Sequence, residues 1–519
     1  MAGVAMAKKS FVGGAIILML AGFVVRIFGF VYRIYLSNLI GAEGMGLFQL
    51  ISPVYSLIIL TLTAGISISV SRMVAGELAK NHIINLRRIT TCALVLVLSL
   101  GIIVSIGIYI NLNFIVNVIL KDSRTYWSML LLIPCIPVIA AASAVKGYFY
   151  GIQQVGPTAV SQIVEQVVKI GLVMAMAGHF VNVGLEYACA LATVGMAAGE
   201  IANLLVLILV YSLRRKKNQG ATSRSGLIRK RTIMRDLITI SAPISFNRFV
   251  TSIMFSVEMI LIPRALLAGG LDYQRSMEEF GRLAGMAMPL LFFPSLVTSS
   301  LATTLVPAIS EAMSLKQFKS VNYRISKSIQ LTFILGFIFT AIFMSYAHEI
   351  GNMIYRKENI GGILYLLSFT CVSLYLQQTL LGTLNGLGKQ GVSLRNAIIG
   401  NAIRIGFVYF CIPVYGLTGY VWGIIISSAC VCVLNLYTVI KTTGMAVDLR
   451  NWIVKPGLVC IAMILISKYV YSFFSIFSWG EAFTMALTIL GNVFVGTGLM
   501  FVAGVLHKEE VIKLLKVKK

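Results

Sequence analysis

The chain has 519 residues, of which 58% are hydrophobic and only 12% are charged, whereas a water-soluble domain carries roughly 25% charged residues. Its 43 Lys and Arg against 18 Asp and Glu give a formal net charge of +25. These basic residues fall mostly in short segments between apolar runs, as topology signals do in membrane proteins. A nucleic-acid-binding protein instead clusters them on one face of a folded domain, so we expect an integral membrane protein with no nucleic-acid partner.

Apolar windows of about 20 residues predict fourteen transmembrane helices. The first window follows Lys8 and Lys9 but runs on without a small-residue cleavage site, so it is expected to remain as an uncleaved helix. In chain order, the predicted helices cover residues 11–36, 48–71, 89–112, 126–145, 158–178, 187–212, 237–263, 283–310, 328–346, 360–384, 394–413, 417–440, 452–473 and 482–506.

The distribution of Lys and Arg predicts the orientation of these helices. With the N-terminus inside, the cytoplasmic segments hold 30 Lys and Arg and the external loops hold seven. Positively charged loops stay on the cytoplasmic side, so we expect a multi-pass protein of the cytoplasmic membrane with both termini in the cytoplasm. The longest polar stretch, from Leu213 to Asp236, is expected to be a topology anchor and flexible linker, with binding of anionic lipid headgroups as the alternative.

The sequence repeats itself at an offset of 235 residues, because the segment starting at Gly151 resembles the segment starting at Gly386. This match pairs Lys169 with Arg404, and a second match at an offset of 236 links the second and eighth predicted helices. Two six-helix halves of the same orientation follow, and in such parallel repeats the substrate path lies between the halves. We predict an all-α polytopic fold with an N-terminal lobe at 1–213, a basic cytoplasmic linker at 214–236, a C-terminal lobe at 237–440, and helices 13 and 14 with a basic tail at 441–519.

Charged side chains inside the predicted spans indicate where a substrate binds. An ionisable side chain in a spanning helix costs on the order of 3 kcal/mol and normally faces a cavity or a partner. The spans hold six basic side chains and three acidic ones, and Arg is the side chain best shaped to hold phosphate oxygens. We therefore expect a cationic cavity for an anionic substrate. The candidate substrate-binding residues are Arg26, Arg33, Glu165, Lys169, Arg248, Glu258, Asn401 and Arg404.

Other roles stay open for some of these side chains. Glu165 and Lys169 lie four residues apart on one predicted helix, a spacing at which they would neutralise each other. Arg33 lies nearer the external face, where a long basic side chain reaches the interface without any functional role. For Arg26, Arg248 and Arg404, no acidic residue lies three or four positions away on the same helix, which favours a functional role.

No metal, cofactor or nucleotide site is expected from the sequence. The eight cysteines lie in apolar segments without CxxC spacing or neighbouring histidines, a pattern that fits neither disulfides nor zinc. The segment GTLNGLGKQ, which starts at Gly382, fails the phosphate-loop pattern because Gln390 replaces the required Ser or Thr.

Four segments carry a family resemblance. They are AGFVVRIFGFVYRIYLSNLIGAEGMGLFQL from Ala21, ISVSRMVAGELAK from Ile68, SQIVEQVVKI from Ser161 and VPAISEA from Val306. In them the chain resembles the polysaccharide-export branch of the multidrug/oligosaccharidyl-lipid/polysaccharide flippase superfamily, and the likeness extends over essentially the whole chain. The resemblance implies a MATE-like transporter and not an enzyme. It also implies alternating access that moves a lipid-linked peptidoglycan precursor of the lipid II type for spore cortex synthesis.

The resemblance implies roles for individual residues and partners as well. Arg26, followed by Gly29 and Phe30, fits the Arg-x-x-Gly-Phe pattern of the lipid II flippases, whose arginines bind the pyrophosphate. Their second arginine falls one residue before Arg33, and their basic residue in helix 8 corresponds at best to Arg282. The implied partners are an undecaprenyl-pyrophosphate-linked glycan, membrane lipids and peptidoglycan polymerases, with the last helix pair forming a groove for the polyprenyl tail.

Other functions compete with this one. An exporter of another undecaprenyl-linked oligosaccharide would need the same residues. An ion-coupled multidrug exporter would use membrane carboxylates, and Glu165, Glu200 and Glu258 leave room for it. A membrane glycosyltransferase or polymerase would need acidic residues for base or metal chemistry, but the four aspartates lie far apart in the sequence with no Asp-x-Asp.

Overall fold

The computed structural model describes residues 2–80, 82–180, 183–217, 227–356, 358–476 and 480–506, and side chains from residue 20 onward except 215–217 and 482. Within these ranges every regular element is a helix, in agreement with the all-α prediction. The chain divides into two compact units, Met1–Ile260 and Leu261–Lys519, which are described one at a time. The predicted division into two lobes, a linker and a terminal helix pair stays a prediction.

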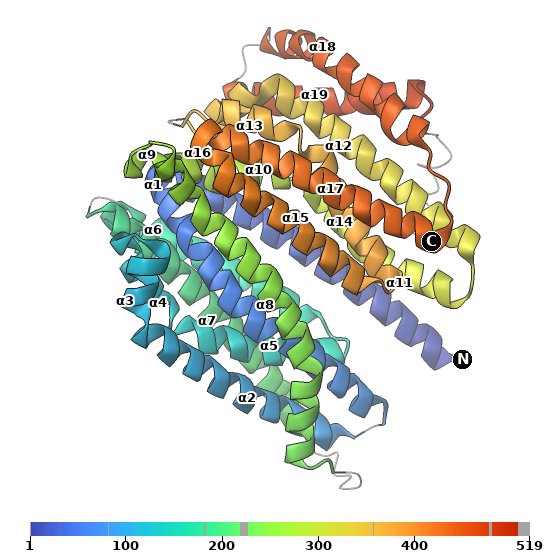
Figure 1. Cartoon of the computed structure of the whole chain (residues 1–519). Coiled ribbons are helices and arrows are strands. Elements are labelled where there is room, and N and C mark those ends of the chain that lie inside the picture. The colour runs from blue at the N-terminus through green and yellow to red at the C-terminus, as the bar shows by residue number, and fades with distance from the viewer. Residues whose placement is uncertain are drawn as a thin grey trace. The chain divides into compact units, whose positions relative to one another are not determined.

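The first unit consists of long helices joined by short ones (Figure 1). Its elements are α1 (Ala2–Ala79), α2 (Ile83–Ile110), α3 (Leu112–Phe114), η1 (Ile115–Leu120), η2 (Ser123–Thr125), α4 (Tyr126–Leu132), α5 (Cys135–Gly151), α6 (Gly156–Phe180), α7 (Leu185–Lys217) and most of α8 (Lys230–Ala268). α1 joins the first two predicted helices across a break at Gly41, where φ is 68°. Glycine adopts this left-handed conformation without steric cost.

The core of the first unit is made by five of its helices. Fully buried apolar side chains meet from α1 (Val70), α2 (Ile89), α5 (Phe149), α7 (Leu207) and α8 (Ile233). The start of α8 therefore belongs to this core. The middle of the predicted linker, residues 218–226, lies outside the described residues.

The second unit has a similar build. Its elements are α9 (Tyr273–Phe280), η3 (Gly281–Ala287), α10 (Met288–Phe292), α11 (Ser295–Ser314), α12 (Phe318–Ile354), α13 (Gly361–Ser368), α14 (Cys371–Gly386), α15 (Gln390–Phe410), α16 (Ile412–Tyr415), α17 (Leu417–Thr443), η4 (Arg450–Val454), α18 (Lys455–Ser475) and α19 (Glu481–Val502). Its core joins α11, α12, α14, α17 and η4, through Ile309, Ile325, Leu380, Val439 and Trp452.

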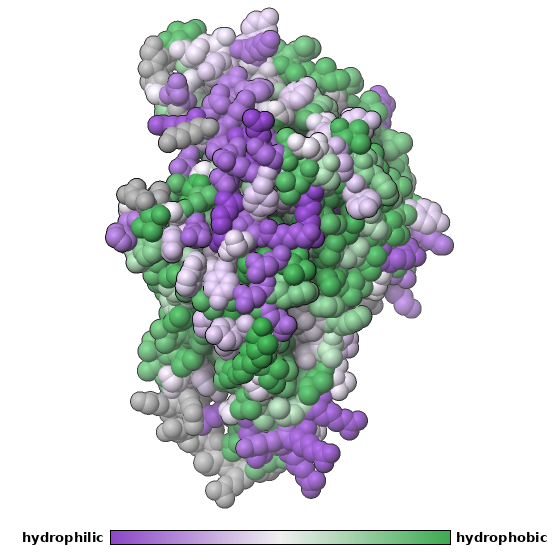
Figure 2. Space-filling model, turned by 60° about the vertical axis from the view of Figure 1, so that its left-hand side comes forward, coloured by the Kyte–Doolittle hydropathy of each residue, from purple (hydrophilic) through white to green (hydrophobic). Residues whose placement is uncertain are grey.

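Among the described residues, ten helices are long and apolar enough to cross a membrane, and two bent helix pairs raise the number to twelve. The bent pairs are α4 with α5, at 41°, and α13 with α14, at 55°. The predicted count of fourteen is not confirmed, because α1 counts as one such helix and α15 is not among them. Figure 2 shows hydrophobic residues over much of one face, whereas soluble monomers rarely expose apolar patches larger than a few hundred Å². This surface suits lipid.

The internal repeat is visible in how helices pack within each unit. In the first unit, a Cβ added at Gly151 of α5 would lie 2.7 Å from Val74 Cβ of α1. In the second unit, a Cβ added at Gly386 of α14 would lie 2.9 Å from Ile309 Cβ of α11. The paired glycines of the repeat therefore have the same packing role, since each lets two helices approach more closely than a larger residue would allow.

Candidate functional site

Two carboxylates and one amide meet in the first unit, between α6 and α7. The Asn203 side-chain amide donates hydrogen bonds to Glu165 Oε2 at 2.7 Å and to Glu200 Oε2 at 3.4 Å. Asn203 is fully buried, so its amide is held between the two acids. We name Glu165, Glu200 and Asn203 the carboxylate cluster.

Glycines of α7 allow α6 to come close enough to form this cluster. A Cβ added at Gly195 would lie 2.5 Å from Val173 Cγ2, and a Cβ added at Gly199 would lie 2.8 Å from the carbonyl oxygen of Glu165. Small residues four positions apart are typical of closely packed transmembrane helices. The sequence GMAAGE thus places Glu200 directly after the residue that contacts the backbone of Glu165.

Basic side chains surround the carboxylate cluster. Lys169 lies one turn beyond Glu165 on α6, and its Nζ is 5.1 Å from the ring centroid of Tyr32, a cation–π distance. Lys169 interacts electrostatically with both carboxylates and with Arg33, and Lys146 of α5 interacts with both carboxylates. Cations of α5 and α6 thus partly offset the charge of the two acids, and Lys169 follows Glu165 by one turn of the same helix, as their spacing predicts.

The two predicted arginines of α1 differ in exposure. Arg33 is half-buried, next to the buried Tyr32, and interacts electrostatically with Lys169. The Arg26 side chain is exposed. Because seven residues separate them, the two arginines leave α1 on the same face.

The two predicted substrate-binding residues of α8 also differ in exposure. Glu258 is buried, with 1% of its surface exposed, whereas Arg248 is exposed. Between them the helix packs on α1, since Ser256 Oγ donates a hydrogen bond to the Pro53 carbonyl oxygen at 2.9 Å. The part of α8 near Glu258 is thus fixed to α1, whereas the side chain of Arg248 is exposed.

In the second unit the structure brings Asn401 and Arg404 together on α15. Arg404 Nη2 donates a hydrogen bond to Asn401 Oδ1 at 2.5 Å, and both side chains are half-buried. α15 is held on α17 by a buried amide pair, in which Asn396 Nδ2 donates to Asn435 Oδ1 at 2.9 Å. The Asn401 amide therefore restrains the Arg404 guanidinium on a helix that is itself anchored.

Arg282, which the resemblance aligns with a cavity residue, contacts three carboxylates within the second unit. Its Nε lies 3.0 Å from Glu358 Oε2, its Nη1 lies 3.0 Å from Glu279 Oε1, and its Nη2 lies 3.6 Å from a Glu278 oxygen. Burial alone would lower the pKa of Arg282, but hydrogen bonds and charges from Glu358 and Glu279 raise it above its ordinary value. Arg282 thus ties η3 to the chain after α12.

Two members of the carboxylate cluster, Glu200 and Asn203, and the nearby Lys146 are not among the predicted site residues. Glu200 is predicted only as a membrane acid, and Asn203 follows it by one turn on the same face of α7. Lys146 is predicted in a cytoplasmic loop, but α5 continues past the apolar window to Gly151. The sequence does carry a signal for the α6-facing side of α7. Glu200 and Asn203 follow Gly195 and Gly199, the two small residues that allow close packing on α6.

A comparison with family models gives the family. A model described as "Polysaccharide biosynthesis protein" matches residues 11–313, more than half of the chain. The chain belongs to this family. A second model, described as "Lipid II flippase MurJ", matches residues 286–490.

Individual relatives and solved structures agree with the family. The chain is 28% identical to stage V sporulation protein B of Bacillus subtilis (strain 168), over 98% of either chain. Its fold is similar to that of the lipid II flippase MurJ in an inward closed conformation, with a TM-score of 0.69 at 14% identity over 96% of this chain and 100% of that chain. It is also similar to an inward-facing multidrug resistance MATE family transporter, with a TM-score of 0.62 at 15% identity over 82% and 100%. The predicted family resemblance and the MATE-like and lipid II flippase-like membrane fold are confirmed.

Proposed function

We propose that this family member is a flippase that moves an undecaprenyl-pyrophosphate-linked glycan of the lipid II type across the cytoplasmic membrane. The observation that carries the proposal is the exposure of Arg26 and Arg248 on helices that are otherwise apolar enough to span a membrane. Charged side chains in a spanning helix are costly and normally face a water-filled cavity or a partner, and an anionic headgroup would be such a partner. The likeness to a model named for lipid II flippases supports the choice of substrate.

The chemistry of the proposed step is binding and release, with no bond broken. A pyrophosphate offers several oxygens in a geometry that the planar guanidinium fork holds with two hydrogen bonds. Arg26, Arg33, Arg248 and Arg404 are the proposed ligands, and Asn401 orients Arg404 for this role. Exchange between inward and outward arrangements of the two halves would carry the headgroup across while the polyprenyl chain stays in lipid.

The direct test is transport of lipid II in proteoliposomes that contain the purified chain. Arg26→Ala and Arg248→Ala should each slow translocation by roughly tenfold, the worth of one charge-assisted hydrogen bond. Arg231→Ala is the matched control, because Arg231 is also exposed on α8 but lies in its first turn. Unaltered transport in both the Arg26 and the Arg248 variant would refute the proposal.

We further propose that the transported precursor serves spore cortex peptidoglycan, with peptidoglycan polymerases consuming it on the far side of the membrane. The relative named for sporulation supports this role. Expression of this chain in Bacillus subtilis that lacks that relative should restore cortex and heat-resistant spores. Restored lipid II transport in proteoliposomes without any restored cortex would limit the proposal to the transport step.

The carboxylate cluster favours a second candidate function, an ion-coupled multidrug exporter. Glu165 and Glu200 are half-buried and share the amide of Asn203, and acids in spanning helices mark proton or cation pathways in transporters. This function predicts drug resistance on expression and proton movement driven by drug gradients. Both should be lost in Glu165→Gln and Glu200→Gln. Drug transport without lipid II translocation would favour the multidrug exporter over the flippase.

A further inference from the structure

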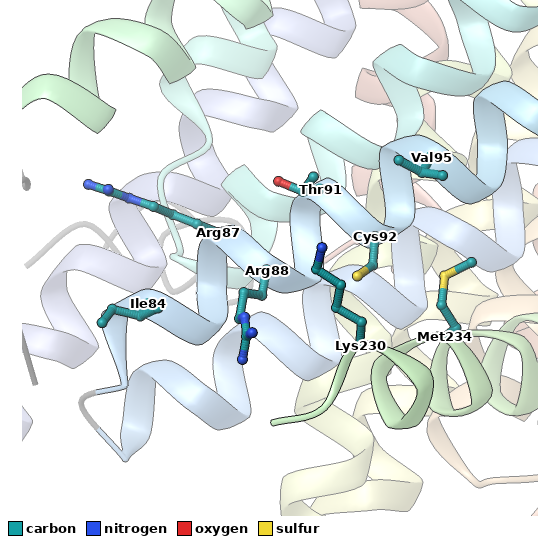
Figure 3. A pocket seen from close by; sticks show the side chains of 8 residues that line it. All are labelled: Ile84, Arg87, Arg88, Thr91, Cys92, Val95, Lys230 and Met234. Atoms are coloured by element: carbon teal, nitrogen blue, oxygen red, sulfur yellow. The ribbon is translucent and has the colours of Figure 1, made fainter. Parts of the chain in front are cut away.

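A second region of the first unit has the form of a ligand site. A cavity of about 440 Å³ lies between the start of α2 and the start of α8. Figure 3 shows its lining side chains, with Lys230 reaching from α8 toward Cys92 and Arg88 of α2, and Arg87 extending outward. We name this cavity the basic pocket, lined by Ile84, Arg87, Arg88, Thr91, Cys92, Val95, Lys230 and Met234. None of the candidate substrate-binding residues lines it.

The basic pocket is built by specific contacts between segments far apart in the sequence. The Ile228 N–H donates a hydrogen bond to Asn85 Oδ1 at 3.3 Å, and the Ile228 carbonyl oxygen accepts one from Arg88 Nη1 at 3.0 Å. Asn85 is itself buried and donates to Glu77 Oε2 at 2.7 Å. Both polar backbone groups of Ile228 are thus fixed to α2, which sets Lys230 opposite Arg88.

Both walls of the basic pocket change from cationic to apolar in the same direction. On α2 the lining residues recur every three or four positions and so share one face. Val95 lies seven residues beyond Arg88, or about 10 Å deeper along the helix. On α8, Met234 lies one turn beyond Lys230. Both helices are apolar enough to span a membrane from these ends, so the cations lie where a lipid headgroup lies and the apolar wall follows the acyl chains.

The charge of the basic pocket is not compensated by its own lining, because the eight lining residues include no acid. The nearby Glu77 is already engaged, with its carboxylate 3.0 Å from Lys80 Nζ and 3.0 Å from His82 Nδ1. Arg88 uses one of its five N–H donors on Ile228. An anion with an attached apolar chain complements this arrangement.

We propose that the basic pocket binds one anionic phospholipid, with its phosphate between Arg88 and Lys230 and one acyl chain along Val95 and Met234. The apolar wall selects a lipid over a soluble phosphate, and the two cations select an anionic headgroup over a zwitterionic one. A bound lipid would hold the start of α8 on α2. It would therefore act at the linker end of the first unit and not on the transported substrate.

Native mass spectrometry of the full chain released from mixed nanodiscs tests the proposal. Phosphatidylglycerol should remain bound to the parent protein, whereas phosphatidylcholine should not. Arg88→Gln with Lys230→Gln should weaken phosphatidylglycerol retention by roughly thirtyfold, since each cation near a lipid surface is worth about 1 kcal/mol. The matched control is Arg229→Gln with Arg231→Gln, which removes two exposed charges outside the lining and should retain the lipid. An equal loss in both pairs would overturn the proposal, because only diffuse charge would then matter.

A second variant keeps the charges and removes the space. Thr91→Trp places an indole in the basic pocket at an exposed position of α2, so it should displace the lipid while the chain still folds. Retained lipid in this variant would overturn the proposal. So would displacement of phosphatidylglycerol by millimolar inorganic phosphate, which would mark a soluble-anion site. Displacement by a polyprenyl pyrophosphate at equal concentration would assign the cavity to the transported substrate and overturn it as well.

Discussion

The carboxylate cluster depends on the side-chain amide of Asn203. Its Nδ2 serves both Glu165 and Glu200, while its Oδ1 has no hydrogen-bond partner among the described residues. The two acids alone therefore set the orientation of this amide. A neutral side chain of the same size that cannot donate would leave two half-buried carboxylates without their shared donor.

Asn203→Leu should lower the free energy of unfolding by about 1–3 kcal/mol, because two half-buried carboxylates lose the donor that they share. Thermal unfolding of the purified protein in detergent measures the change. Asn247→Leu is the matched control, since Asn247 is exposed on α8, and it should leave stability unaltered. Equal stability of Asn203→Leu and the parent would show that the amide does not hold the acids.

Arg282 joins three carboxylates of the second unit, and its loss should also destabilise the protein. Arg282→Met leaves Glu278, Glu279 and Glu358 without their shared cation, and we expect a cost of about 1–3 kcal/mol. Hydrogen exchange should rise around η3. Arg275→Met changes an exposed arginine of α9 and should have no such effect. If both variants exchange alike, the three ion pairs contribute nothing measurable.

At the scale of elements, hydropathy predicts where helices lie but not where they break. The windows at 126–145 and 360–384 each correspond to a bent pair of helices. Pro134 caps the second helix of the first pair, but no proline lies between α13 and α14, so nothing local marks that break. Hydropathy averaged over a window also fails to predict that α5 continues past Lys146 to Gly151. Boundaries set by tertiary contacts are therefore absent from the periodicity of the sequence.

The same limit applies to the candidate site. Glu165 and Lys169 are predictable as neighbours because four residues separate them on one helix. Asn203 contacts Glu165 from another helix, and a single sequence does not state which helix faces which. Two glycines on α7 carry part of that information, since close approach of helices needs small residues.

Gly199→Leu should therefore separate α6 from α7. A Cβ at Gly199 would lie 2.8 Å from the Glu165 carbonyl oxygen, whereas a Cβ at Gly171 of α6 meets no atom within 4 Å. We expect Gly199→Leu to cost about 1–3 kcal/mol in stability through overpacking, and Gly171→Leu to cost far less. Size-exclusion profiles and thermal unfolding compare the two. A greater loss in Gly171→Leu would contradict the assigned helix contact.

At the scale of the whole molecule, two glycines that the sequence repeat pairs have the same packing role in different units. Gly151 and Gly386 occupy the same place in the repeat, and each lies against a helix of its own unit. The carboxylate cluster, by contrast, belongs to the first unit only, and the repeat pairs Lys169 with Arg404 beside Asn401. In the proposed transport, the two halves would move alike while their different polar residues bind different parts of one substrate.

This separate packing predicts that damage stays within the unit that receives it. Gly151→Leu should increase hydrogen exchange in α5 and the facing part of α1, and Gly386→Leu should increase it in α14 and α11. The packing partners of the two glycines belong to different units, so the stability losses of the double variant should add to within about 0.5 kcal/mol. Exchange that rises in both units after either single change would contradict this independence, because the two units would then unfold together.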